Sequence, residues 1–120
     1  MSSQNFIYEA KGECLVIHLP KELDHHNCRN LRYETDLILA EHYISKIIFD
    51  FSRTEFMDSS GIGVLLSRYK QMDRSGGRVV LYGVGTQIER ILAIGGVLRL
   101  AETCSTKEAA IKLERSRTWK

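Results

Sequence analysis

The chain has 120 residues, 43% of them hydrophobic, and 17 basic against 15 acidic side chains give a formal net charge of +2. This length suits a single domain with one core. A nearly neutral charge argues against a nucleic-acid partner, because a dedicated binder clusters basic residues on one face. The first residues lack a signal-peptide pattern, and no run approaches the ~18 apolar residues that cross a membrane.

Three cysteines, Cys14, Cys28 and Cys104, are an odd number at irregular spacing. This pattern argues against a disulfide framework and favours reduced thiols in a cytoplasmic protein. We expect one domain over residues 1–120 with its core at about 6–111. Residues 114–120 are expected to form a flexible tail.

The chain opens with a predicted β-hairpin. Residues 5–19 indicate two strands joined by a tight turn at Lys11 and Gly12. Pro20 ends the second strand because it has no N–H to donate. Apolar residues at helical spacing then predict a helix over 24–43, with Asp24 at its N-cap.

The middle of the chain alternates strands and helices. Lys46–Asp50 and the following Phe51 form a short apolar run typical of a central strand. A helix is expected from about residue 59 to 73, ended by Gly76 and Gly77. A further strand is expected over 78–84.

The last third predicts two short helices around one strand. A helix over 86–96 is expected to be capped by Thr86, and a brief strand over 97–101 to follow it. The final helix, over 105–115, has Ser105 as its expected N-cap and Glu108 in the capping-box position. The order β-β-α-β-α-β-α-β-α predicts an α/β fold with a mostly parallel sheet.

Residues 56–66, FMDSSGIGVLL, stand where the second of these helices starts. The simplest interpretation is structural: Asp58 or Ser59 caps the helix, while Gly61 and Gly63 let it pack closely on the sheet. However, one cap needs only one polar side chain, and each helical glycine costs ~1 kcal/mol relative to alanine.

The same stretch suits a phosphate group. The free N–H groups and the dipole of a helix N-terminus favour negative charge. A serine at this position can therefore carry a phosphoryl group of roughly −1.5 to −2 charge without unfolding the domain. Because Asp58 opposes that charge, we expect the modification to change the surface more than the fold.

A catalytic serine is the competing interpretation, with His25 or His26 as base and Asp24 or Asp58 orienting it. The nucleophile-elbow pattern G-x-S-x-G is absent, so no catalytic residue is expected. His25, His26 and Cys28 lie too close together to chelate from one helix face, and no second ligand pair has zinc-like spacing. We expect no metal and no cofactor.

The turn at residues 83–85, GVG, lies between a strand and a helix, as a dinucleotide-binding loop would. The full G-x-G-x-x-G motif is missing because Ile88 occupies its last position. A plain turn is the better interpretation, and weak affinity for phosphate stays open.

Three segments together resemble a known family. They are KELDHHN at 21–27, FMDSSGIGVLLSRYKQM at 56–72 and GGRVVLYGV at 76–84. They are similar to the anti-sigma factor antagonists of the STAS domain superfamily, above all to the sporulation anti-anti-sigma factor of endospore-forming bacteria. The resemblance covers about residues 6–111. It implies a single mixed β-sheet opened by a hairpin, with about four helices largely on one face.

The resemblance also implies a mechanism. The serine after the aspartate, here Ser59, would be phosphorylated by an anti-sigma factor that is also a serine kinase. The unphosphorylated antagonist would bind the anti-sigma factor and release the sigma factor. A serine phosphatase would reverse the modification. The chain would then be a binding protein in sporulation and not an enzyme.

Other positions match the family's switch loop. By the resemblance, Asp24 and His25 would lie beside the loop, Asp58 would cap the helix and contact the partner, and Ser60 and Gly61 would shape the loop. Lys21 departs from the pattern, because it stands where the family usually has glycine. The alternative hypothesis is a nucleotide- or anion-sensing STAS interaction domain without a phosphoserine switch.

Overall fold

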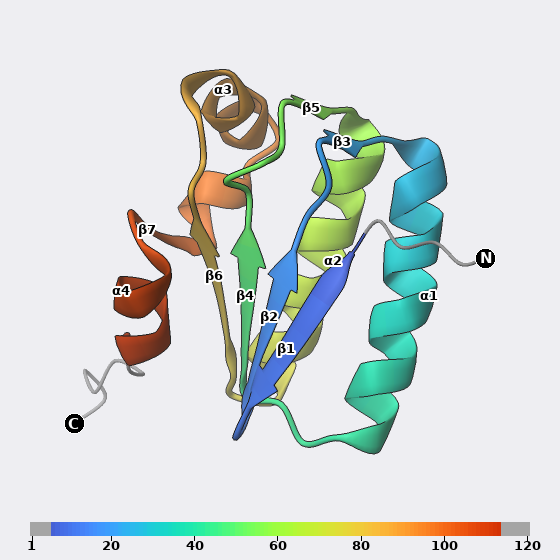
Figure 1. The fold of residues 1–120 in the computed structure, drawn as a ribbon, viewed down its shortest axis with the longest axis vertical. Coiled ribbons are helices and arrows are strands. Elements are labelled where there is room, and N and C mark those ends of the chain that lie inside the picture. Colours follow the sequence, from blue (N-terminus) through green and yellow to red (C-terminus); the bar gives the residue numbers. More distant parts are fainter. Residues whose placement is uncertain (1–5, 114–120) are drawn as a thin grey trace.

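The computed structural model describes residues 6–113, which form a layered α/β domain (Figure 1). A five-stranded sheet of order β1-β2-β4-β6-β7 lies at its centre. The first pair is the antiparallel hairpin, and every other neighbouring pair is parallel. The strands of this sheet are β1 (Ile7–Lys11), β2 (Cys14–His18), β4 (Lys46–Asp50), β6 (Arg78–Tyr82) and β7 (Glu102–Cys104).

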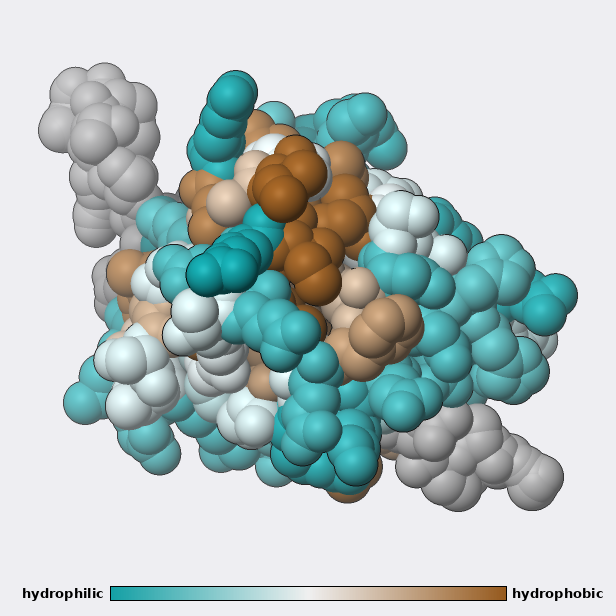
Figure 2. Space-filling view, turned by 90° about the horizontal axis from the view of Figure 1, so that it is seen from above, coloured by the Kyte–Doolittle hydropathy of each residue, from teal (hydrophilic) through white to brown (hydrophobic). Residues whose placement is uncertain are grey.

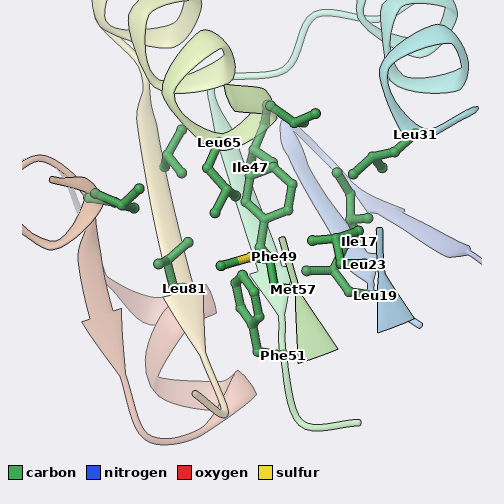
Figure 3. Close-up of a cluster of buried hydrophobic side chains, with 14 of the residues drawn as sticks. Ile17, Leu19, Leu23, Leu31, Ile47, Phe49, Phe51, Met57, Leu65 and Leu81 are labelled. Carbon is green, nitrogen blue, oxygen red and sulfur yellow. The ribbon is translucent and has the colours of Figure 1, made fainter. Parts of the chain in front are cut away.

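Three helices cover one face of the sheet, and one short helix lies against the other. The larger core contains Phe49 and Leu81 from the sheet with Leu31 and Leu65 from the helices, and Figure 3 shows them as parts of one cluster of buried side chains. A smaller cluster around Ala110 fills the second face. The expected arrangement, with helices largely on one face, is confirmed. The helices are α1 (His25–Glu41), α2 (Ser59–Arg74), α3 (Thr86–Ile94) and α4 (Lys107–Lys112).

A second, two-stranded sheet was not predicted. It pairs β3 (Glu22–Leu23) with β5 (Phe56–Met57) in parallel, with Leu23 opposite Met57. Each strand has two residues, too few to show an alternating pattern. This small sheet sets the starts of α1 and α2 side by side (Figure 1).

Two predictions in the last third are wrong. Residues 97–101 do not form a strand: Val97–Arg99 is a 3-10 turn, and β7 starts only at Glu102. The left-handed Gly96 (φ 83°) turns the chain here, and Val97 is buried in the larger core. A short apolar run alone does not show whether the residues form a strand or a 3-10 turn.

Two predicted caps are also wrong. α3 has Gly85 at its N-cap without a side-chain hydrogen bond, so Thr86 is already its first helical residue. At α4, Thr106 and not Ser105 accepts the hydrogen bond, from the Ala109 N–H at 3.0 Å. The shift by one residue takes Glu108 out of the capping-box position.

Ion pairs and hydrogen bonds attach α4 to the sheet at both of its ends. The Lys107 ammonium lies 2.6 Å from the Glu9 carboxylate of β1. Lys46 of β4 donates to the last carbonyl groups of the helix, where the dipole is negative. Its acceptors are Ala110, Ile111 and Leu113.

A chain of charged groups continues from Glu9 across the strands. The His18 ring lies between two carboxylates, with Nε2 3.2 Å from Glu9 and Nδ1 2.5 Å from Asp50. The bonds from Lys107 and then His18 lower the pKa of the Glu9 carboxyl. Burial raises the pKa of the Asp50 carboxyl, but hydrogen bonds from Ser52 and His18 outweigh burial, and the net shift is downward.

The predicted tail over 114–120 lies outside the described residues. Within 6–113, no helix combines the length and the hydropathy that crossing a membrane requires.

Candidate functional site

The carboxylates of Asp24 and Asp58 organise the two helix starts. Asp24 is the N-cap of α1 and accepts a hydrogen bond from the Asn27 N–H at 2.9 Å. Asp58 is the N-cap of α2 and accepts one from the Ser60 N–H at 2.8 Å. Its second oxygen accepts from the His25 N–H of α1 at 3.1 Å. One carboxylate therefore joins the N-termini of both helices.

The two serines differ in surroundings. Ser59 is the first residue of α2 and is exposed, and its hydroxyl has no hydrogen-bond partner within residues 6–113. Ser60 is half-buried, and its Oγ lies 3.3 Å from Nδ1 of His25. Solvent, or a partner's active site, thus has freer access to the Ser59 hydroxyl, which lies at the positive end of a helix.

Gly61 and Gly63 also differ, which corrects the expectation that both pack on the sheet. A Cβ atom on Gly61 would lie 2.6 Å from Cγ of Met57, so any larger residue would displace the Met57 side chain at the close contact between α2 and β5. A Cβ atom on Gly63 would meet nothing within 4 Å. The prediction is confirmed for Gly61 and wrong for Gly63.

A buried arginine that the sequence analysis did not single out ties α1 to α2. Only 4% of Arg68 is exposed. Its Nη2 donates to Thr35 Oγ1 at 2.8 Å and pairs with Asp36 at 2.5 Å. An arginine about two and a half turns into an otherwise amphipathic helix gives no pattern that predicts such burial, because arginine is mostly exposed.

Apolar side chains gather near Ser59. Phe56 of β5 is 51% exposed and Ile94, the last residue of α3, is 88% exposed. Ile62 of α2 packs beside the end of α3, since a Cβ atom on Gly95 would lie 2.8 Å from its side chain. Figure 2 looks onto this end of the molecule and shows brown, hydrophobic residues gathered there. Such a surface beside a free hydroxyl is typical of a protein contact site.

The geometry does not favour catalysis or metal binding here. His25 and His26 are exposed, while Cys28 is buried. Burial, followed by the Asp58 and Asp24 carboxylates, raises the pKa of the Cys28 thiol to about 11, which makes it a poor nucleophile and ligand. Among residues 6–113, no three His, Cys, Asp or Glu side chains are placed to hold a metal ion.

Gly83 and Val84 of the turn at 83–85 line a pocket of about 450 Å³ beside β7, whereas Gly85 lines a separate pocket that contains Arg90. Gly83 has a positive φ of 74°, and a Cβ atom there would lie 2.9 Å from the Ser52 backbone, so the turn itself requires this glycine. Glu89 lines the pocket beside β7 and no lysine or arginine does. These walls do not favour a phosphate.

Comparisons with known proteins agree with the fold. The STAS domain family matches residues 5–110. The anti-sigma F factor antagonist of Paenibacillus polymyxa is 33% identical over 86 residues, which are 72% of this chain and 74% of that relative. The solved structure of the anti-sigma factor antagonist SpoIIAA in its unphosphorylated form is 31% identical, with a TM-score of 0.80 over 88% of this chain and 92% of that one.

A second solved structure is that of the Bacillus cell fate determinant SpoIIAA in its phosphorylated form. It is also 31% identical, with a TM-score of 0.72 over 88% of this chain and 96% of that one. From the family match and these similarities, the chain belongs to the STAS domain family, in the group of anti-sigma factor antagonists.

Proposed function

We propose that this antagonist is switched by phosphorylation of Ser59. The observation that carries the proposal is the free, exposed hydroxyl of Ser59 on the first turn of α2. A helix of 16 residues starts here, and its N-terminus tolerates added negative charge. A related chain is known in a phosphorylated form, which supports the same chemistry for this one.

The unphosphorylated chain binds an anti-sigma factor with serine kinase activity, and the bound sigma factor is released. In the kinase step, the Ser59 oxygen bonds to the γ-phosphorus of ATP, the bond to the leaving ADP breaks, and a base on the kinase takes the hydroxyl proton. A serine phosphatase later hydrolyses the phosphoserine. The chain itself supplies the acceptor hydroxyl and no catalytic group.

The charge of the phosphate supplies the switch. It introduces roughly −1.5 to −2 charge beside the Asp58 carboxylate, at the end of the molecule where β5 and α3 carry the exposed Phe56 and Ile94 (Figure 1). A partner that covers this surface would have to desolvate the phosphate, so its affinity falls. The fold is retained because the helix N-terminus and solvent both stabilise the anion.

The surrounding residues form the switch loop. Asp24 and Asp58 hold the two helix starts, and Gly61 lets α2 sit directly on β5. Ser60 and His25 form the wall beside the acceptor hydroxyl. We place the protein in the cytoplasm and its role in sporulation, following the relatives' activity as anti-sigma F factor antagonists.

Site-mapped mass spectrometry tests the acceptor. The chain is incubated with ATP and the anti-sigma F factor from the genome that encodes it. We expect one phosphoryl group on Ser59, none in Ser59→Ala, and Ser59 as the acceptor also in the matched variant Ser60→Ala. Transfer to Ser60 in the wild type, or none with a kinase active on another antagonist, contradicts the proposal.

A further inference from the structure

A groove of about 270 Å³ runs between the first turns of α1 and α2. His25, Arg29 and Arg32 of α1 line one side, and Ser60 and Gly63 of α2 line the other. We call these five residues the basic groove. The spacing i, i+4, i+7 puts the three cationic or titratable side chains on one face of α1. Of these three side chains, only that of His25 belongs to the site predicted from the sequence.

Among the residues that the structure describes, no carboxylate forms an ion pair with the side chains of the basic groove. Arg29 is exposed, and within residues 6–113 no carboxylate lies in ion-pair distance of its guanidinium. Arg32 donates only a long hydrogen bond, 3.4 Å, to the Ser67 hydroxyl. The nearby carboxylates of Asp24 and Asp58 accept hydrogen bonds from backbone N–H groups of the helix starts. The groove therefore presents guanidinium groups that are open to an anion.

Gly63 is a second, independent observation. A glycine inside a helix destabilises it relative to alanine, and its missing side chain lets another group approach the backbone closely. Within the described structure nothing approaches Gly63, since a Cβ atom there would meet no atom within 4 Å. The missing side chain keeps the groove open to something from outside.

The walls suit an acidic side chain better than a bare anion. Cys28 and Val64, only 3% and 2% exposed, form an apolar floor between the helices. A glutamate or aspartate could lay its methylene groups on this floor beside Gly63. Its carboxylate would then reach Arg29 and Arg32, and a guanidinium can hold a carboxylate through two parallel hydrogen bonds.

We propose that the basic groove receives an acidic side chain of the anti-sigma factor, and that this contact positions the partner's kinase site over Ser59. The inference rests on the proposed function, because it names a contact with the same partner. Ser60, next to the acceptor in sequence, lines the groove, so a partner over Ser59 lies within reach of it.

Charge reversal tests the contact. The affinity of the anti-sigma F factor is measured by titration calorimetry for wild type, Arg29→Glu, Arg32→Glu and the control Arg74→Glu. Arg74 is exposed at the opposite end of α2. We expect each groove variant to raise Kd by about tenfold or more and to flatten the dependence on salt. Arg74→Glu should stay within about twofold of wild type.

Gly63→Ala tests the space without changing a charge. Alanine favours the helix, so the Tm should rise, while its methyl group narrows the groove and Kd should increase. A higher Tm with an unchanged Kd would mean that nothing enters beside Gly63. This result, or Arg29→Glu binding like Arg74→Glu, overturns the inference.

The outcome separates the two proposals. If wild type binds the anti-sigma factor and is phosphorylated on Ser59, but the groove variants behave like wild type, only the groove contact is wrong. If wild type neither binds nor becomes phosphorylated, both proposals are wrong.

Discussion

Removal of the Asp58 carboxylate should destabilise the fold about twice as much as removal of the Asp24 carboxylate. Asp58→Ala removes the acceptor for the Ser60 N–H at 2.8 Å and for the His25 N–H at 3.1 Å. The lost N-cap costs ~1 kcal/mol and the second hydrogen bond about another 1 kcal/mol. Asp24→Ala removes one hydrogen bond from a backbone N–H, that of Asn27, and should cost ~1 kcal/mol.

Asparagine variants distinguish the N-cap hydrogen bond of Asp58, from the Ser60 N–H, from its second hydrogen bond, from the His25 N–H. Asn is as good an N-cap as Asp, so Asp24→Asn should change the free energy of unfolding by less than about 0.5 kcal/mol. In Asp58→Asn, one oxygen still accepts from Ser60, but the amide NH₂ faces the His25 N–H as a second donor. This variant should therefore lose about 1 kcal/mol, half the effect of Asp58→Ala.

Urea unfolding followed by far-UV circular dichroism measures all four variants, since a small single domain usually unfolds in a two-state transition. The m-value should match that of wild type, so that a shift in the midpoint reports stability alone. Equal losses for Asp58→Ala and Asp24→Ala would refute the argument that one carboxylate joins both helices. So would an Asp58→Asn variant as stable as wild type.

Three further outcomes are expected. Gly61→Ala should lower the free energy of unfolding by about 1–3 kcal/mol in the same urea assay. The new methyl group would lie 2.6 Å from Cγ of Met57 and would overlap that side chain. Unchanged stability would contradict the close contact. The pKa values of the Glu9 and Asp50 carboxyls are lowered in the fold, so the ionised carboxylates stabilise it. This stabilisation is complete above the ordinary pKa values of 4.5 and 3.8, and it is lost as the pH falls through the lower values in the folded state. Unfolding followed from pH 5 to pH 2 should therefore show a loss of stability that is smaller in Asp50→Asn, and an equal loss in both proteins would count against the cluster. ATP at millimolar concentration should leave the Tm unchanged, because no lysine or arginine lines the pocket beside Gly83 and Val84. A concentration-dependent rise would favour a nucleotide-sensing role.

The sequence predicts the long elements of this fold well. Helical spacing and an aspartate at each start identify α1 and α2 to within about two residues. The strands β3 and β5 have two residues each, too few to show the alternating hydrophobic pattern of a strand. Their pairing nevertheless brings Asp24 next to Asp58. The sequence therefore predicts which residues form the candidate site, but not the strand pairing that brings them together.

Where prediction failed, tertiary contacts decided the outcome. Val97 turns into the core after the left-handed Gly96, which a run of apolar residues does not reveal. Gly61 and Gly63 look alike in the sequence, but only Gly61 meets a neighbouring side chain. The helical spacing of Arg29 and Arg32 was visible, whereas their lack of carboxylate partners depends on how α1 and α2 pack.

The most direct test of the central claim compares the affinity of two forms of the same chain for the anti-sigma F factor. The unmodified chain and the chain phosphorylated on Ser59 are purified separately and titrated under identical salt and nucleotide conditions. We expect the phosphorylated form to bind at least about tenfold more weakly, because the new charge must be desolvated beside Asp58. Ser59→Ala should bind like the unmodified chain. Equal affinity of the two forms would contradict the phosphoserine switch.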